Sequence, residues 1–166
     1  MAFCVFNNRM WLMGGTDGTA RNDVYSSTDG ITWTQATAAA GWSARIMAAA
    51  VSYQNLMWIM GGQDTGGTDL RDVWNSTDGI TWTQVDAAAD WATRRGLGLV
   101  AFNNRMWVMG GFNGSNLNDV WWSTNGTTWT QATAAAAWSA RYLHNAVSYG
   151  GRMWIWAGET GAGITN

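Results

Sequence analysis

The chain has 166 residues, a formal net charge of −2 and a pI near 5.1. This length suits one domain, and the charge gives no electrostatic reason to expect binding to nucleic acid or to an anionic membrane. No run of about 18 apolar residues is present, which excludes a membrane-spanning helix. The N-terminal segment lacks the basic region of a signal peptide. We therefore expect a soluble protein, and its single cysteine, Cys4, leaves the compartment undetermined.

The composition is unusual in three respects: 14 tryptophans, 21 glycines, and neither proline nor lysine. Lysine is normally among the commonest residues, so its absence from independent positions would be surprising. Positions in copies of one segment are not independent, so a residue absent from the original segment is absent from its copies as well. The composition therefore indicates that one unit was amplified, by natural duplication or by design.

A repeat runs through the whole chain. The segment MWLMGG at 10–15 returns as MWIMGG at 57–62, as MWVMGG at 106–111 and as MWIWAG at 153–158. These copies are 47 to 49 residues apart. Such a period is typical of repeat architectures in which each unit is one supersecondary element.

Four short strands are predicted within each unit. In the second unit the second strand is nearly continuous in apolar residues, as expected for a strand buried on both faces. The fourth alternates Ile80, Trp82 and Gln84 with threonines, a pattern that favours a strand with one wet face. The predicted ranges in this unit are 48–53, 56–62, 72–77 and 80–85.

A hairpin is predicted between the third and fourth strands of each unit. The nonapeptide STDGITWTQ occurs at 27–35 and again at 76–84, and STNGTTWTQ occurs at 123–131. Asp-Gly and Asn-Gly tolerate the positive φ angles of tight turns. We therefore interpret the residues before these glycines as turn formers: Asp29, Asp78 and Asn125.

The alanine-rich segment at 36–45 is predicted to be a link between sheets rather than a helix. Alanine favours helix, but the segment is shorter than the roughly 12–15 residues that an isolated helix needs. Crossing from the outer to the inner strand of four covers about 15 Å, which ten residues span easily.

Four antiparallel strands in about 50 residues describe a propeller blade, and here the sequence resembles the kelch family. The resemblance is closest to the bacterial kelch-like type found in the propeller of galactose oxidase. It rests on the glycine pairs and on a tryptophan in the fourth strand. SxDGxTW also resembles the Asp-box turn of sialidases. The residues expected to have structural roles are Gly14, Gly15, Gly61, Gly62, Gly110, Gly111, Trp33, Trp82 and Trp129.

The predicted fold is all-β, with about three and a half four-stranded antiparallel blades in one partial propeller over residues 1–166. Its blades span about 1–36, 46–85 and 96–132, with a half blade at 142–158. The loop sequence after this half blade matches the one that elsewhere leads into a third strand. Apolar blade faces need neighbours, so we expect a homo-oligomer that completes the ring. A two-fold dimer is favoured over a monomeric ring or a head-to-tail polymer.

The sequence offers little for catalysis, so we expect no enzyme activity, no metal and no cofactor. His144 is the only histidine and Glu159 the only glutamate. The copper site that galactose oxidase implies needs more than one histidine, and transition-metal sites draw on clustered imidazoles or thiolates. The nucleophile pair that a sialidase needs is also missing.

The expected binding surface is the rim of the central channel, with a small glycan or a peptide as ligand. Arg45, Arg94 and Arg141 occupy one position in each unit, so they would grip a carboxylate together or bond to a neighbouring blade. Just after them the copies differ, by selection for binding or by neutral drift. The candidate rim residues are Arg45, Met47, Arg94, Arg95, Arg141, Tyr142, His144 and Asn145.

Overall fold

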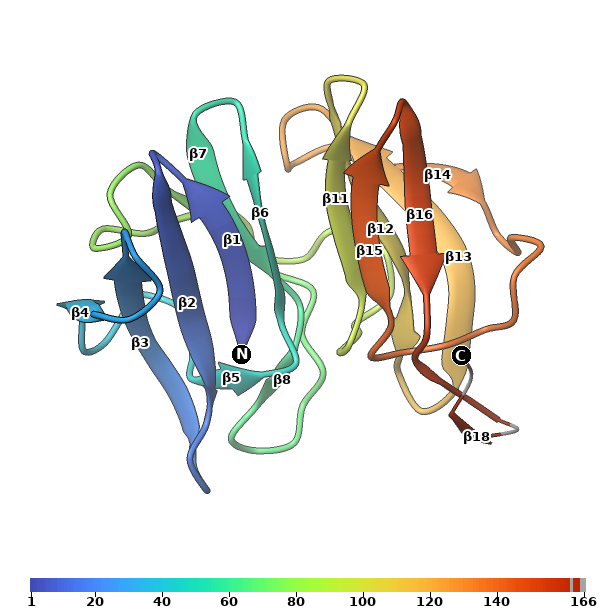
Figure 1. Ribbon diagram of the computed structural model, residues 1–166. Helices are drawn as coiled ribbons and strands as arrows, with labels where there is room; N and C mark the ends of the chain where they lie inside the picture. Colours follow the sequence, from blue (N-terminus) through green and yellow to red (C-terminus); the bar gives the residue numbers. More distant parts are fainter. Residues whose placement is uncertain (162, 165–166) are drawn as a thin grey trace.

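The computed structural model describes residues 1–161, 163 and 164, and in these residues it contains strands and turns but no helix (Figure 1). Three antiparallel sheets follow one another along the chain. The first blade consists of β1 (Ala2–Phe6), β2 (Arg9–Thr16), β3 (Ala20–Ser27) and β4 (Thr34–Thr37). The second consists of β6 (Ala49–Tyr53), β7 (Leu56–Met60), β9 (Val73–Ser76) and β10 (Thr83–Asp86). The third consists of β11 (Gly98–Phe102), β12 (Arg105–Phe112), β13 (Asn116–Ser123) and β14 (Thr130–Thr133).

A two-stranded sheet follows, which we call the C-terminal hairpin: β15 (Asn145–Tyr149) and β16 (Arg152–Trp156). Short pairs join the blades at one end. β5 (Arg45–Ile46) pairs with β3 of the first blade and with β8 (Gln63–Asp64) beside the second. β17 (Glu159–Thr160) pairs with β18 (Gly163–Ile164). The predicted match of 159–166 to a loop that precedes a third strand falls partly outside the described residues, which omit 162, 165 and 166.

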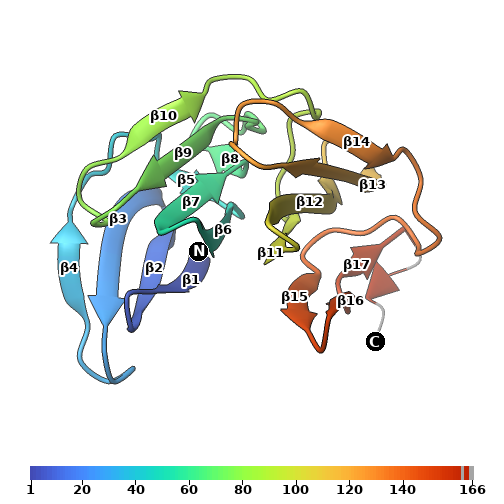
Figure 2. The same cartoon turned by 90° about the horizontal axis from the view of Figure 1, so that it is seen from above.

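The sheets stand in an arc with their first strands, β1, β6, β11 and β15, nearest the centre (Figure 2). Residues of all four strands line one hollow of about 460 Å³. Each strand pairs antiparallel with the next in its blade, and the sheets face one another. The predicted fold, a β-propeller of four-stranded antiparallel blades, is confirmed.

Alternation along the inner strands divides each blade into two faces. In β1 the side chains of Ala2, Cys4 and Phe6 are buried against the second blade, whereas Phe3 and Val5 point away from it and are exposed. Apolar clusters fill the interfaces between the first and second blades, the second and third, and the third and the C-terminal hairpin. The core therefore lies between the sheets, and each sheet depends on its neighbours.

The predicted fourth strand is wrong at its start. It was expected over 80–85, but β10 begins at Thr83 because the turn extends further than the Asp-Gly pair. One oxygen of Asp78 accepts hydrogen bonds from the backbone N–H groups of Ile80 and Thr81, both at 2.8 Å. The indole of Trp82 donates back to the carbonyl of Gly79 at 3.2 Å.

The glycine pairs mark places where the backbone needs positive φ and close approach. Gly61 has φ +63°, and a Cβ there would lie 2.9 Å from the carbonyl oxygen of Arg94. At Gly14 and Gly110 an added Cβ would lie 3.0 Å from the equivalent carbonyl oxygens, those of Arg45 and Arg141. No larger residue fits these positions without moving the connector against which they pack.

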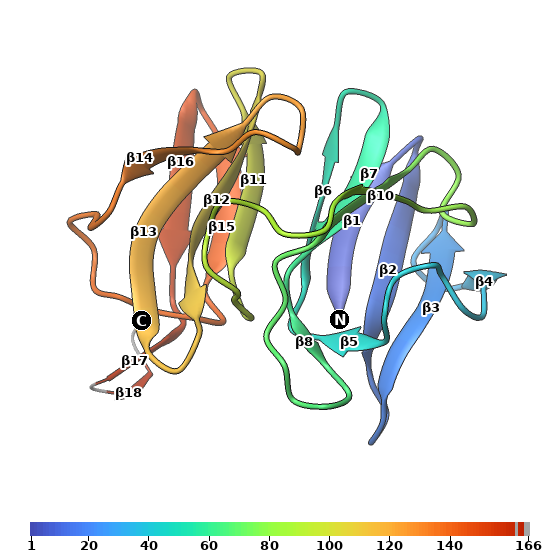
Figure 3. The ribbon, with the colours of Figure 1, turned by 180° about the vertical axis from the view of Figure 1, so that it is seen from behind.

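The alanine-rich links form no helix, as predicted. The segment after β10 runs across from the second blade to the third (Figure 3). The described part of the chain includes no helix long and apolar enough to span a membrane.

Candidate functional site: the channel rim and the uncovered sheet faces

Two of the three repeated arginines are engaged in buried ion pairs. Arg45 grips the carboxylate of Asp72 through Nη1 and Nη2, both at 2.7 Å, and donates to the carbonyl of Gly61 at 3.0 Å. Arg94 contacts Asp119 and the carbonyl of Gly110 in the same way. Both arginine side chains are fully buried. Their guanidinium groups bind the following blade and do not face the channel.

Asp119 is partly withdrawn from water at this pair. Burial alone raises the pKa of a carboxyl group, but the hydrogen bond and charge of Arg94 outweigh it and hold the pKa of Asp119 below its usual value. The indole N–H of Trp121 adds a further hydrogen bond to this carboxylate at 2.8 Å.

Arg141 has the same local contacts as the other two arginines but not the same ion pair. Its Nη1 donates to the carbonyl of Ala157 at 2.8 Å, and its Nε donates to that of Ser139 at 3.0 Å. No carboxylate among the described residues forms an ion pair with it. Arg141 is therefore the one repeated arginine that keeps an unneutralised guanidinium.

Turns from three of the predicted rim segments are joined by backbone hydrogen bonds. The N–H of Gly96 donates to the carbonyl of Met47, and the N–H of Leu143 donates to that of Gly96, both at 2.8 Å. All three residues have φ between +54° and +60°. With Met1 and His144 they border a hollow of about 220 Å³. The rim is thus a row of similar turns passing from blade to blade.

Two of the polar rim residues, Arg95 and Tyr142, pair with side chains of neighbouring loops. Arg95 binds Asp69 at 2.7 Å and lies 4.5 Å from the ring centre of Phe112. The hydroxyl of Tyr142 donates to Glu159 at 2.8 Å, and this acceptor raises the pKa of Tyr142. These contacts hold the loops in place and leave few free donors.

His144 is buried, and neither imidazole nitrogen has a well-formed hydrogen bond to a residue that the structure describes. Burial, and then the charge of Arg141, lower its pKa to about 4. The ring packs against Gly98 and Gly110, where a Cβ would lie 2.6 Å and 3.2 Å from it. The described residues include no group of three His, Cys, Asp or Glu side chains able to hold a metal. His144 is a neutral packing residue in this arrangement.

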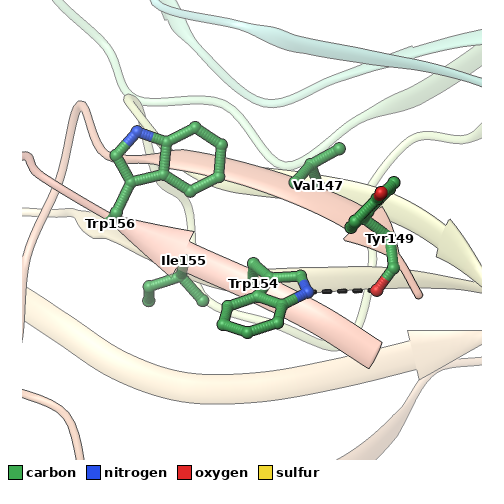
Figure 4. Close-up of a pocket in the computed structure, with 5 residues that line it drawn as sticks. All are labelled: Val147, Tyr149, Trp154, Ile155 and Trp156. Carbon is green, nitrogen blue, oxygen red and sulfur yellow. Dashed lines mark hydrogen bonds between the residues drawn. The ribbon is translucent and has the colours of Figure 1, made fainter. Parts of the chain in front are cut away.

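One exposed apolar surface was not among the named rim residues. Val147, Tyr149, Trp154 and Trp156 lie on the side of the C-terminal hairpin that faces away from the third blade and border a hollow of about 500 Å³ (Figure 4). Tyr149 is 77% exposed and Trp154 49%. Apolar residues at alternate positions of 147–156 were the sequence signal for this surface. Asn145, which was named, pairs with Trp156 on the same face.

The first blade has an uncovered face as well. Phe3 and Val5, 50% and 57% exposed, lie on it beside their cross-strand neighbours Leu12 and Met10. Leu12 and Tyr25, with Gly14 and Asp23, border a hollow of about 190 Å³. The two ends of the arc are therefore both apolar, and neither is covered by described residues.

Radially arranged four-stranded sheets with this inner-strand packing define a β-propeller domain. The family model of the KLHDC2/KLHL20/DRC7 Kelch-repeats domain matches residues 1–158, so the chain belongs to this kelch family. A search of curated proteins finds no significant match. Kelch-repeat domains are propeller-type protein-interaction scaffolds and are generally not enzymes.

Proposed function

We propose that this kelch scaffold associates with a second copy of itself. The uncovered face of the C-terminal hairpin would pack against the uncovered face of the partner's first blade. The observation that supports this is the exposure of large apolar side chains on both faces, a kind of patch that marks interaction surfaces. The near-identical units support an origin by copying one blade.

The internal interfaces provide a template for this contact. Trp11 of the first blade lies over Gly79 in the hairpin of the second, where a Cβ would be 2.2 Å from the indole. Trp58 lies over Gly126 of the third blade in the same way, at 2.4 Å. Trp154 is the equivalent tryptophan of the C-terminal hairpin, and Gly30 is the equivalent glycine of the first blade. We expect these two to meet between copies.

A tyrosine extends the same template. Tyr53 of the second blade donates its hydroxyl to the carbonyl of Asn104 at 2.8 Å, across the interface to the third blade. The residue at the equivalent register position in the C-terminal hairpin is Tyr149. The counterpart of Asn104 in the first blade is Asn8. A hydrogen bond from Tyr149 to Asn8 of the partner subunit would reproduce the internal contact.

The uncovered face of the C-terminal hairpin differs from that of the first blade, so each junction between copies joins two unlike surfaces. A two-fold arrangement uses both faces of both copies and closes the assembly, whereas a rotation that does not close would give a filament. Closure removes both apolar faces from water, and we therefore favour the dimer.

Size-exclusion chromatography with light scattering tests the proposal directly. We expect twice the chain mass of 18.1 kDa for the wild type. In Gly30→Ala the added Cβ would lie where Trp154 of the other copy should pack, which should raise the dimer dissociation constant at least tenfold.

Gly18→Ala is the matched control. Gly18 also has positive φ, but nothing lies within 4 Å of its added Cβ, so this variant carries the backbone strain without the obstruction. A wild type that stays at 18.1 kDa at all concentrations, or equal effects of the two substitutions, would contradict the proposal.

A further inference from the structure

The interface between the first and second blades and that between the second and third are each filled by a tryptophan and an arginine from the connector. Trp42 meets the ring of Trp82 edge-on at 5.9 Å, and Arg45, three residues later, reaches Asp72 and the carbonyl of Gly61. Trp91 meets Trp129 at 5.8 Å, and Arg94 contacts Asp119 and Gly110 in the same way. The guanidinium carbon of each arginine also lies over the indole of the tryptophan three residues before it, 5.7 and 5.6 Å from the ring centre. The connectors thus contribute a Trp-x-x-Arg unit to the second blade and to the third.

The first blade has equivalents of the residues that contact this Trp-x-x-Arg unit in the second and third blades. Gly14, Asp23 and Trp33 occupy the positions of Gly61, Asp72 and Trp82.

No hydrogen bond or ion pair among the described residues reaches the carboxylate of Asp23, which borders the hollow of about 190 Å³ together with Gly14. Trp33 is only half-buried, whereas Trp82 and Trp129 are 7% and 5% exposed. Among the described residues, Asp23 therefore has no ion-paired arginine and Trp33 has no edge-on aromatic partner, although the charge of Arg21 is close enough to act on Asp23.

None of the residues that the structure describes fills this place. Arg21 borders the hollow, but its Nε and Nη2 donate to Asp17. Where the other blades have Trp74 and Trp121, whose indole nitrogens donate to the carboxylate, the first blade has Tyr25, whose hydroxyl instead accepts from Gln35. Asp23 therefore has neither of its counterparts' donors.

We propose that the first blade binds a Trp-x-x-Arg peptide segment of another polypeptide. The guanidinium would grip Asp23 with two hydrogen bonds and donate to the carbonyl of Gly14, a geometry that suits arginine better than lysine. The indole would pack edge-on against Trp33. This site does not depend on the self-association proposed above. In a closed assembly the peptide would fill the junction as the connectors fill the internal ones.

The test uses a synthetic peptide with the sequence of residues 38–47, AAAGWSARIM, labelled with fluorescein and titrated with the protein in an anisotropy assay. We expect saturable binding. Replacing the peptide's tryptophan by alanine, or its arginine by lysine, should each weaken binding at least tenfold. These variants leave the folding of the protein unaltered.

Substitutions in the protein complete the test. Asp23→Asn keeps the shape and removes the charge, and it should weaken binding at least tenfold. Asp86→Asn removes the same charge from β10 in the second blade and should leave binding unchanged. Equal binding of all three peptides, no effect of Asp23→Asn, or no binding at millimolar protein would overturn the proposal. Light scattering of the same samples reports self-association separately, so failure of one proposal is distinguishable from failure of the other.

Discussion

Arg94 holds the carboxylate of Asp119 with two hydrogen bonds, at 2.7 and 2.8 Å, from a guanidinium that has no contact with solvent. The arginine belongs to the connector and the aspartate to the third strand of the next blade. The pair therefore fixes how one sheet follows another. Arg45 and Asp72 repeat it one blade earlier.

Removing the acid of this pair should be strongly destabilising. Asp119→Ala leaves the buried guanidinium of Arg94 without a counterion, and breaking a buried pair in this way costs about 3–5 kcal/mol of unfolding free energy. Urea denaturation followed by tryptophan fluorescence measures the loss. Asp17→Ala, which breaks an exposed pair with Arg21, is the control and should leave the urea midpoint unchanged. Equal midpoints for the two variants would contradict the structural role of Asp119.

The hairpin turns allow a direct comparison, because the chain has an aspartate at this turn position in one blade and an asparagine in another. Asp78 and Asn125 accept the same two backbone hydrogen bonds, at 2.8 and 3.0 Å respectively. Asp78→Asn should therefore preserve stability, whereas Asp78→Ala leaves two backbone donors without this acceptor and should cost about 1–2 kcal/mol. Thermal unfolding by circular dichroism ranks the variants. A loss in Asp78→Asn as large as in Asp78→Ala would show that charge, rather than hydrogen bonding, holds the turn.

Much of this fold could be predicted because its determinants are local. The Gly-Gly pairs, the Asp-Gly turns and the 47–49-residue period each specify part of one blade. The start of the fourth strand could not be placed, because a side-chain oxygen of Asp78 takes the backbone donors that a strand would use. The repeat spacing predicts that Arg45 and Arg94 occupy equivalent positions, but it does not predict whether they bind a ligand or a neighbouring blade. That choice depends on Asp72 and Asp119, which lie 27 and 25 residues further along the chain.

The contact between Trp58 and Gly126 should be very sensitive to an added methyl group. In Gly126→Ala the new Cβ would lie 2.4 Å from the indole, so the tryptophan must move and the interface must open. Such overpacking costs about 1–3 kcal/mol. Gly114→Ala is the control, since Gly114 has φ +105° and nothing within 4 Å of its added Cβ. The difference in unfolding free energy between the variants measures the overpacking, and no difference would show that the blades adjust freely.

His144 should make stability fall as the pH falls below neutrality. The imidazole titrates near 6.5 when unfolded but at about 4 when folded, because burial and Arg141 disfavour its charged form. Well above pH 6.5 both states are neutral, so the folded state keeps its full stability. As the pH falls from 6.5 towards 4, only the unfolded state binds the proton, and unfolding becomes easier. The expected loss between pH 7 and pH 5 is about 2 kcal/mol.

His144→Leu isolates this effect from the titration of the carboxylates. Leucine occupies the equivalent position in the third blade, Leu97, where it is buried. The variant should therefore fold, and it cannot bind the proton. Urea unfolding at pH 7, 6 and 5 should show the wild type losing stability relative to the variant as the pH falls. Parallel curves for the two proteins would mean that His144 is already protonated in the folded state, or that it is accessible to water.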